Sequence, residues 1–580
     1  PLGYIWARTI RCQNPSCRAE IPLMRQFWLA RKKNKRIALK PIVDKKNKRV
    51  KFKIVKGKDI DFDPSQGTVR RATVRCLVCG VGIDDKTLRR LFQRGECSQR
   101  MIAVVLRKPE QSGSRIYRLA TSRDLEIYKQ AERYLQEKVE KLREKWGIDP
   151  IPNEPLPKER ARGFSGFRIL LYGMSMWGDL FNERQKPTLV TFIDKIRESY
   201  HRMLDEGYDK EYAKAIVSYL GLGFDVFAAY NCSLARYRGD TESIERVFDR
   251  QALQMLWDYG EVNPFGRSRG DWLEILGLGI KVLENCLKIN SKKNSPKIFQ
   301  VSATELPFPN NYFDAIITDP PYYDNVAYGD LSDFFYVWLK RVLGDIHQDL
   351  LATPLTPKSL EIIQDPARGK DSKFFERMLT KAFREIHRVL KPDGIAVIVF
   401  AHKSTEAWEA VISSLLESGL VLTASWPIHT EMRERLIAHE SAALASSIYM
   451  VCRKRVKEET AYFNEIKEEL ERRVKEKLEQ FWEQGISGAD FFVSAIGPAV
   501  EVFGRYSRVE KLSGEEVSVQ ELLEYVRRIV SEYALERVLK SPDLGGVDNV
   551  TRFYLIWRWT FGNAKVHFDD AIKLSRPLGV

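Results

Sequence analysis

The chain has 580 residues, 44% of them apolar, and its 94 Lys and Arg outnumber its 78 Asp and Glu, which gives a net charge of +16. This length predicts three to four domains of about 150 residues each, and the composition excludes global disorder, a collagen-like repeat and a disulfide-dense secreted scaffold. The positive charge indicates a polyanionic partner, with nucleic acid as first choice and a generally basic soluble protein as the alternative. We find no run of about 18 uncharged apolar residues and no signal-peptide core, and therefore expect a cytoplasmic protein without a transmembrane helix.

Four of the eight cysteines form two close pairs near the start of the chain. Cys12 and Cys17 are separated by four residues, Cys76 and Cys79 by two, and 58 residues lie between the pairs. Four thiolates at such spacing suit a tetrahedral structural zinc ion, with unmetallated cysteines as the alternative. We expect residues 1–123 to form a zinc ribbon.

A strongly basic insert lies between the two cysteine pairs. From Arg31 to Lys58 it carries 14 Lys and Arg but one acid, Asp44. Residues 36–39 and 50–55 are typical of two strands of a hairpin. Cations spaced along such a ribbon can follow a duplex backbone without reading bases, so the hairpin is a candidate phosphate-contacting arm; the alternative is a solvated charged hairpin.

The middle of the chain is predominantly helical by its apolar spacing. A charged helix is expected over residues 124–146, followed by a proline-rich linker at 151–157, and residues 160–270 are expected to be mostly helical. We assign 124–270 as a helical linker and candidate target-recognition region.

Strands alternate with helices from residue 271 to 455, which predicts an α/β fold with a doubly wound, mainly parallel sheet and allows an antiparallel last strand. The expected strands cover residues 297–301, 314–318, 395–400, 420–426 and 446–452, and the expected helices cover 271–289, 373–390 and 405–418. Residues 456–483 predict a long charged helix that begins an α-rich C-terminal module, 456–580.

The motif Asp319-Pro320-Pro321-Tyr322 directly follows an expected strand, where ligands of open α/β sheets bind. The two prolines restrict the backbone and fix the directions of the Asp319 carboxylate and the Pro320 carbonyl. Both are acceptors suited to an exocyclic amino group, and Tyr322 offers a flat face for an unstacked base. Two acceptors holding the amine favour a pyramidal nitrogen that can attack a methyl sulfonium. The alternative is a rigid turn with a packed tyrosine.

Two neighbouring segments complete this expected site. His402 and Lys403 follow the strand 395–400 and so are expected on the same rim, either as DNA contacts or as ordinary loop residues. Residues 324–336, directly after the motif, are expected to form a mobile lid.

Residues 318–340 resemble the amino-methyltransferase motif of the zinc-ribbon-containing adenine-specific DNA methylases. The resemblance also covers the cysteine pairs, Glu20-Ile-Pro-Leu, Gly173-Met-Ser-Met-Trp-Gly-Asp-Leu-Phe, Tyr230-Asn-Cys-Ser-Leu, residues 257–265, Ala443-Leu-Ala-Ser-Ser-Ile and Gly485-Ile-Ser-Gly-Ala-Asp-Phe-Phe. It implies a Rossmann-like sheet, S-adenosylmethionine as cofactor, DNA as substrate, N6-adenine as target and a role in restriction or anti-phage defence. By this resemblance Asp319 to Tyr322 bind the target base, and Asp319 and Glu305 approach the cofactor; Glu305 is otherwise a surface acid before a turn.

The family's glycine-rich cofactor loop is missing from this sequence, since no Asp-Pro-Phe-x-Gly-x-Gly pattern follows a strand. By resemblance the sheet order is 3-2-1-4-5-7-6, and the expected strands supply numbers 3 to 7 only. We therefore expect an incomplete sheet and a second polypeptide that supplies strands 1 and 2 with the glycine-rich loop, the alternative being a truncated chain. Other activities left open are N4-cytosine methylation, RNA methylation and an inactive zinc-containing nucleic-acid-binding module.

Overall fold

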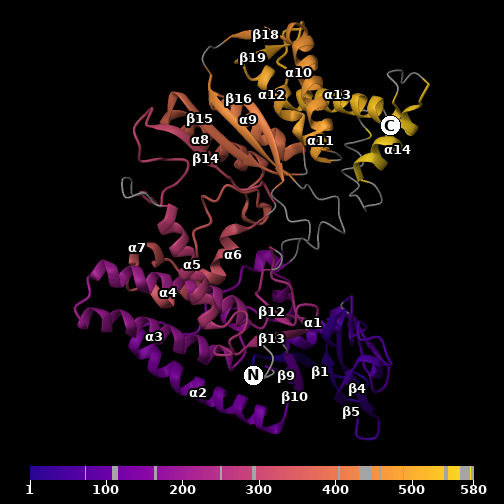
Figure 1. Cartoon of the computed structure of the whole chain (residues 1–580), viewed down its shortest axis with the longest axis vertical. Coiled ribbons are helices and arrows are strands. Elements are labelled where there is room, and N and C mark those ends of the chain that lie inside the picture. The colour runs from indigo at the N-terminus through magenta and orange to yellow at the C-terminus, as the bar shows by residue number, and fades with distance from the viewer. Residues whose placement is uncertain are drawn as a thin grey trace. The chain divides into compact units, whose positions relative to one another are not determined.

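Strands and helices both build this chain, which a computed structural model shows to be mixed α/β with several separate sheets (Figure 1). The described residues are 1–71, 73–107, 115–161, 166–248, 251–289, 296–324, 326–402, 405–429, 446–455, 459–486, 489–540, 546–561, 575 and 580. They group into a first unit, residues 1–296 and 327–361, and a second unit, residues 297–326 and 362–580. The finer division into four regions stays a prediction.

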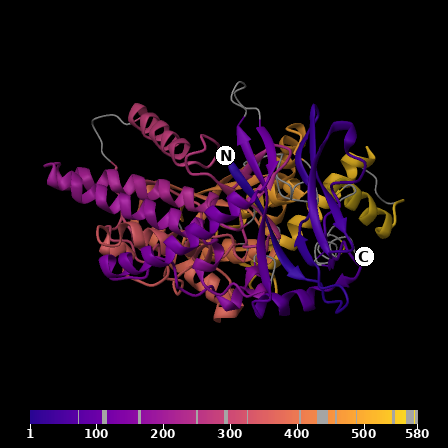
Figure 2. The ribbon, with the colours of Figure 1, turned by 90° about the horizontal axis from the view of Figure 1, so that it is seen from below.

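The first unit contains an antiparallel sheet centred on its N-terminal strand (Figure 2, indigo). Strand β1 (Gly3–Arg11) pairs with β2 (Glu20–Leu23), β9 (Cys97–Arg107) and β13 (Asp258–Val262), and β10 (Arg115–Leu119) extends the sheet beyond β9. Glu261 of β13 is buried and accepts hydrogen bonds from Trp6 Nε1 at 2.6 Å and from Arg184 Nε at 2.7 Å. This pairing gives the segment 257–265 a structural role in joining distant parts of the chain.

The basic insert forms the predicted hairpin, β4 (Lys35–Asp44) with β5 (Arg49–Lys56), and β3 (Trp28–Lys32) adds a third strand. On β5 the residues alternate, because successive side chains point to opposite faces. Val50 and Phe52 are buried, whereas Arg49, Lys51 and Lys53 are exposed. One face of this sheet therefore packs inward and the other carries positive charge.

The remaining elements of the first unit are short strands and long helices, among them the purple and magenta helices of Figure 2. The strands are β6 (Val69–Arg70), β7 (Thr73–Arg75), β8 (Gly82–Ile83), β11 (Arg236–Arg238) and β12 (Ser243–Glu245); the helices are α1 (Asp85–Gln93), α2 (Ser122–Trp146), α3 (Gln185–Asp205), α4 (Lys210–Tyr230), α5 (Trp272–Ile289), α6 (Tyr328–Leu343) and α7 (Gln348–Leu351). The helices α2, α3 and α4 confirm helical structure in the expected region 124–270, which also contains the short strands β11, β12 and β13, and α5 matches the helix expected over residues 271–289.

Helix α4 is, within the described residues, the single helix long and apolar enough to cross a membrane by length and composition. A core helix of a globular unit passes the same test, and the side chains of Val217, Phe224 and Phe227 of α4 are fully buried against the rest of the first unit. This helix is therefore weak evidence for a membrane span.

The expected lid over residues 324–336 is wrong, because most of that segment belongs to α6, whose side chains Phe334, Val337 and Trp338 are fully buried in the first unit. Arg341, on the same helix, is 2% exposed. Its guanidinium donates to the carbonyl oxygens of Asp149 and Val337 and pairs with Glu154 at 3.1 Å. Because removing one partner of a buried ion pair is costly, these contacts keep α6 packed in the core of the first unit, and α6 does not act as a hinged lid.

The second unit contains a four-stranded sheet in the order β14-β15-β17-β16. Its strands are β14 (Phe313–Thr318), β15 (Leu390–Phe400), β16 (Leu420–His429) and β17 (Ser446–Lys454). Strand β14 runs parallel to β15, whereas β17 runs antiparallel to both β15 and β16. The antiparallel last strand is confirmed, and the described sheet is mixed and not mainly parallel.

Helices pack on this sheet through one continuous apolar core. Helix α8 (Ser372–Val389) packs on α9 (Thr405–Glu417), α13 (Val519–Leu539) packs on α9, and α12 (Ile496–Phe503) packs on β16. The observed ends of the four strands, α8 and α9 lie within three residues of the predicted ends. The exception is β15, which begins earlier than predicted.

The strand expected at residues 297–301 does not form, and these residues have no regular secondary structure. Ile298 is 90% exposed, and the ring of Phe299 lies 5.2 Å from that of Phe308. On β14 the side chain of Ile317 is 75% exposed. In the part of the chain that the structure describes, no strand pairs with the outer edge of β14, so residues 297–301 lack the neighbour that a strand requires.

The C-terminal region is α-rich, as expected. Strand β18 (Thr460–Tyr462) pairs in parallel with β19 (Arg508–Glu510), and the remaining helices are α10 (Phe463–Glu483), α11 (Ala489–Ser494) and α14 (Asn549–Phe561). The helix predicted from residue 456 begins at Phe463, because residues 460–462 form β18; residues 456–458 lie outside the described part.

We predict that Arg341→Ala lowers the free energy of unfolding by about 3 to 5 kcal/mol, because it leaves the half-buried Glu154 carboxylate and the carbonyls of Asp149, Ile151 and Val337 without their cation. The matched control is Arg202→Ala on α3, which removes an exposed ion pair with Glu206 and should leave the free energy of unfolding almost unchanged, because solvent screens such pairs. Chemical denaturation of the full chain measures both. Equal losses in the two variants would contradict the structural role of Arg341.

Candidate functional site

The motif at residues 319–322 lies at an open edge of the second unit's sheet. Thr318, which ends β14, pairs in register with Ile398 of the parallel strand β15. The carboxyl ends of both strands therefore meet at one edge, where α/β sheets bind ligands. Asp319 is exposed, and Pro320, Pro321 and Tyr322 are half-buried. The four predicted residues thus stand together on a rim that solvent and a ligand can reach.

Aromatic packing and a sharp backbone turn hold the motif in place. The ring of Tyr322 lies 5.5 Å from that of Phe400 at the end of β15, and the ring of Tyr323 lies 5.0 Å from that of Phe375 on α8. Tyr323 has a φ of 54°, a left-handed conformation that costs energy for a bulky residue. Its N–H donates to the Pro321 carbonyl at 3.1 Å, and its own carbonyl accepts from the Gln364 N–H at 3.1 Å. The turn after the motif is therefore held by side chains and by backbone.

His402 lies on the same rim, as predicted, and contacts the motif's turn. Its Nε2 is 3.3 Å from Asp324 Oδ1, and its carbonyl accepts a hydrogen bond from Trp408 Nε1 at 2.8 Å. The contact with His402 lowers the pKa of the Asp324 carboxyl below its ordinary value. The histidine is buried, so its clearest role is to position the turn. Lys403, predicted beside it, lies outside the described residues.

Glu305 is exposed. Its backbone N–H donates to the Ser302 carbonyl at 3.1 Å. The next residue is tied to α8, since the Leu306 N–H donates to Glu385 and its carbonyl accepts from Arg388. In the described part of the chain no hydrogen bond or ion pair joins the Glu305 carboxylate to the motif. Its predicted approach to the cofactor stays a prediction.

The four predicted cysteines meet in the first unit. Their sulfur atoms all lie within 4.8 Å of one another, with Cys12 Sγ 3.6 Å from Cys79 Sγ and Cys17 Sγ 3.9 Å from Cys76 Sγ. The second pair sits on a tight turn in which the Gly80 N–H donates to the Cys76 carbonyl at 2.9 Å, and Gly80 has a φ of 80° that favours glycine. This cluster is close enough to share one metal ion.

The two ends of the cysteine cluster differ in acidity. Burial raises the pKa of the Cys12 thiol to about 12. A backbone hydrogen bond from Val81 is the main cause that lowers the pKa of the exposed Cys79 thiol to about 7. Without a metal ion, Cys79 is therefore the thiol that ionises first.

Part of the basic hairpin serves the fold and not a ligand. Glu242 is 3% exposed, and it pairs with Lys32 at 2.8 Å and with Lys35 at 2.5 Å while accepting a hydrogen bond from the Tyr117 hydroxyl at 2.7 Å. Glu242 was not predicted as a functional or structural residue, because a single acid in a loop belongs to no sequence motif. The cations left for a phosphate backbone are those of the outer face and the turn of the hairpin, such as Lys46 and Lys51.

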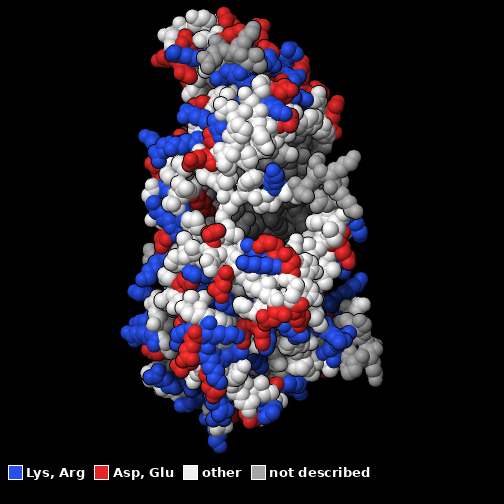
Figure 3. All heavy atoms as spheres, turned by 90° about the vertical axis from the view of Figure 1, so that its left-hand side faces the viewer, with Lys and Arg blue, Asp and Glu red and all other residues white. Residues whose placement is uncertain are grey.

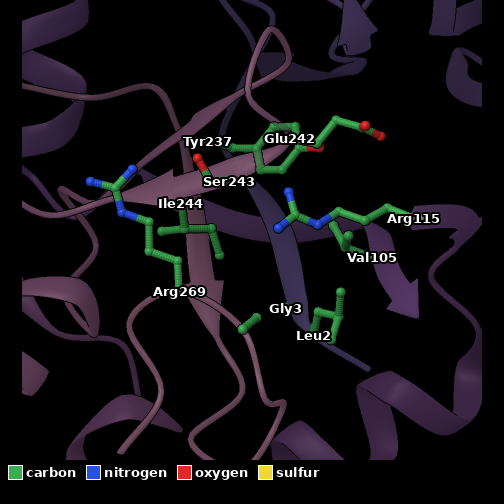
Figure 4. Close-up of a pocket in the computed structure, with 10 residues that line it drawn as sticks. Leu2, Gly3, Val105, Arg115, Tyr237, Glu242, Ser243, Ile244 and Arg269 are labelled. Carbon is green, nitrogen blue, oxygen red and sulfur yellow. The ribbon is translucent and has the colours of Figure 1, made fainter. Parts of the chain in front are cut away.

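A small cavity lies beside this ion-pair cluster (Figure 4). It measures about 20 Å³ and is lined by Tyr237, Ser243, Ile244 and the two arginines Arg115 and Arg269, among others. Each arginine already has a partner, since Arg115 donates to the Thr241 carbonyl and Arg269 pairs with Glu245 at 3.0 Å. The volume suits a single water molecule and excludes a substrate.

No protein-family model, no curated protein and no solved structure matches this chain.

We predict that Cys79 is alkylated fastest of the four clustered cysteines in chelator-treated protein, with a rate that rises to half its maximum near pH 7, because the thiolate is the reactive form. Cys12 should stay almost unreacted at that pH. Iodoacetamide labelling followed by peptide mass spectrometry measures both rates. Uniform labelling of the four thiols would show that the cluster does not form.

Proposed function

We propose that this chain is the base-binding subunit of a split S-adenosylmethionine-dependent DNA amino-methyltransferase that forms N6-methyladenine. The observation that carries the proposal is the position of Asp319-Pro320-Pro321-Tyr322 at the carboxyl end of β14, on the edge shared with β15. The strand order β14-β15-β17-β16, with β17 antiparallel, supports it. It corresponds to strands 4-5-7-6 of the Rossmann-like sheet that the family resemblance implies.

The rim residues suit an exocyclic amine. The Asp319 carboxylate and the Pro320 carbonyl can accept the two amino hydrogens of a flipped base, and the half-exposed Tyr322 ring can stack on its face. Holding both hydrogens favours a pyramidal nitrogen, whose lone pair is then free to attack a methyl sulfonium. The residues therefore act by orienting the amine and by placing negative charge beside it, without covalent catalysis.

The described residues supply only part of a binding site for the proposed cofactor. S-adenosylmethionine, when bound, supplies an electrophilic methyl group on a sulfonium. Asp319, and by resemblance Glu305, are the residues here that would approach it. The glycine-rich loop that would hold its methionine part is not found after any strand in the described residues, so this chain alone does not account for cofactor binding.

A second polypeptide is proposed to complete the site. Support comes from the outer edge of β14, where the described chain offers no paired strand, and from Ile317 on that strand, whose side chain is 75% exposed. Unpaired N–H and C=O groups on a flat apolar edge favour the addition of a strand. The partner would bring strands 1 and 2 and the glycine-rich loop between them.

N4-cytosine methylation remains the second candidate, because cytosine also presents an exocyclic amine to two acceptors. The motif's Asp319 and Tyr322 favour adenine by resemblance only. A purely nucleic-acid-binding function has separate support, since the cysteine cluster and the basic sheet both lie in the first unit and neither needs the sheet of the second.

We propose that the cysteine cluster binds one structural zinc ion. Four thiols within 4.8 Å suit a closed tetrahedral site, which leaves no position for a substrate.

Metal analysis should find one zinc per chain in the unmodified protein and none in Cys76→Ser. This variant should also unfold at a lower temperature, because metal binding is linked to folding. The control, Cys97→Ser, removes a thiol outside the cluster and should retain the zinc. Full zinc content in Cys76→Ser would refute the site.

Asp319→Ala should reduce methyl transfer by about 100-fold to 1000-fold, the loss typical when one preorganised polar group at a reacting centre is removed. The measurement is the incorporation of labelled methyl groups from S-adenosylmethionine into duplex DNA, with the sheet-completing polypeptide present. The matched control is Asp314→Ala on β14, the strand that leads into the motif; its exposed carboxylate pairs with Lys391 at 2.6 Å. Methyl transfer by Asp319→Ala at the rate of Asp314→Ala would overturn the assigned role.

A further inference from the structure

The outer face of α8 carries a row of four exposed cations, Lys373, Arg377, Lys381 and Arg384, named here the α8 stripe. Spacings of four, four and three residues place them on one side of the helix. At 1.5 Å per residue the stripe extends over about 16 Å. In Figure 3, which faces the side of the molecule where Figure 1 labels α8, blue Lys and Arg side chains stand among scattered red carboxylates.

The charges of the stripe have no ion-pair partners within the described residues. Other cations on the same unit do: Arg388 at the end of α8 pairs with Glu385 at 2.8 Å, and Arg472 on α10 pairs with Glu476 at 2.6 Å. The guanidinium of Arg377 lies over the ring of Phe374, 5.7 Å from its centroid, which holds the side chain without neutralising it. The stripe is therefore a row of positive charges that no ion pair within the described residues neutralises.

A groove of about 300 Å³ runs between the stripe and α9. Across it from the stripe lie Ser413, Ser414 and Glu417, while Glu376 of α8 also lines it. Burial and the charge of Glu417 raise the pKa of the Glu376 carboxyl above its ordinary value. Four cations against two acids leave the groove positive, and serine hydroxyls can donate to phosphate oxygens. The groove therefore suits an extended anion.

The stripe begins beside the base-binding rim. Phe375, which lies between Lys373 and Arg377 in the sequence, packs its ring 5.0 Å from that of Tyr323. A nucleic acid strand with one base at Tyr322 can thus continue along the outer face of α8. A small anion would need neither this length nor this position.

We propose that the α8 stripe binds the phosphate backbone of the DNA strand that flanks the target base. The inference rests on the proposed function and deepens it, because it assigns the second unit a DNA contact of its own, distinct from the basic hairpin of the first. At 3.4 Å per phosphate along one strand, 16 Å of helix spans about five phosphates. The contact reads no sequence, since phosphates carry none.

The test uses the full chain and a fluorescein-labelled duplex of about 30 base pairs, with binding followed by anisotropy between about 50 and 200 mM salt. The stripe variant is K373Q/R377Q/K381Q/R384Q. The matched control, K467Q/R472Q/K475Q/K477Q on α10 of the same unit, removes the same charge from a helix whose cations stand among acids. A second stripe variant, K373R/K381R, keeps the charge, and thermal melting confirms that each variant is folded.

The stripe variant should bind at least about tenfold more weakly at 100 mM salt, and its slope of log affinity against log salt should be shallower by up to about 3.6, since each lost phosphate contact removes about 0.9. K373R/K381R and the α10 control should bind like the unmodified chain. Equal binding by the stripe variant and the α10 control would overturn the stripe while leaving the proposed function intact. Absence of salt-dependent DNA binding by the unmodified chain would overturn both.

Discussion

The open edge of β14 is the constraint on which the rest of the second unit depends. One side of this strand is paired in parallel with β15, and the other presents unpaired backbone groups and an exposed Ile317 within the described residues. The paired side fixes the direction in which the chain enters Asp319-Pro320-Pro321-Tyr322. The unpaired side accounts for the failure of residues 297–301 to form a strand, because a strand gains its stability from a neighbour. The fixed position of the motif and the unpaired edge of the described sheet are thus two consequences of one strand.

The chain path after the motif adds a second constraint. It leaves the second unit at residue 326, supplies α6 to the core of the first unit, and returns at residue 362. Buried ion pairs hold the departing segment, since Asp330 pairs with Arg160 at 2.7 Å and Asp333 with Lys358 at 2.8 Å. The returning segment holds the turn after the motif through the Gln364 N–H. Within the second unit, the turn after the motif is therefore held by the segment that returns at residue 362.

Short-range sequence patterns correctly predicted the structural features that depend on residues close together in the sequence. Alternation on β5, the two cysteine pairs and the proline-restricted motif after an apolar strand all appear where the sequence placed them. The features that failed or were missed depend on distant partners. The segment that contains α6 was predicted as a lid, because its local sequence does not show that Trp338 is buried. Glu242 was not predicted, because its partners Lys32 and Lys35 are some 200 residues away in sequence. His402 was placed on the rim by topology, but its contact with Asp324 required the structure.

Calorimetric binding of S-adenosylmethionine tests the central claim most directly, measured with this chain alone and with the sheet-completing polypeptide added. We expect no measurable binding by the chain alone and stoichiometric binding by the complex, because in the proposed function the partner supplies the glycine-rich loop for the cofactor's methionine part. Tight binding by the chain alone would contradict the account, since it would mean that the described sheet already holds a complete cofactor site.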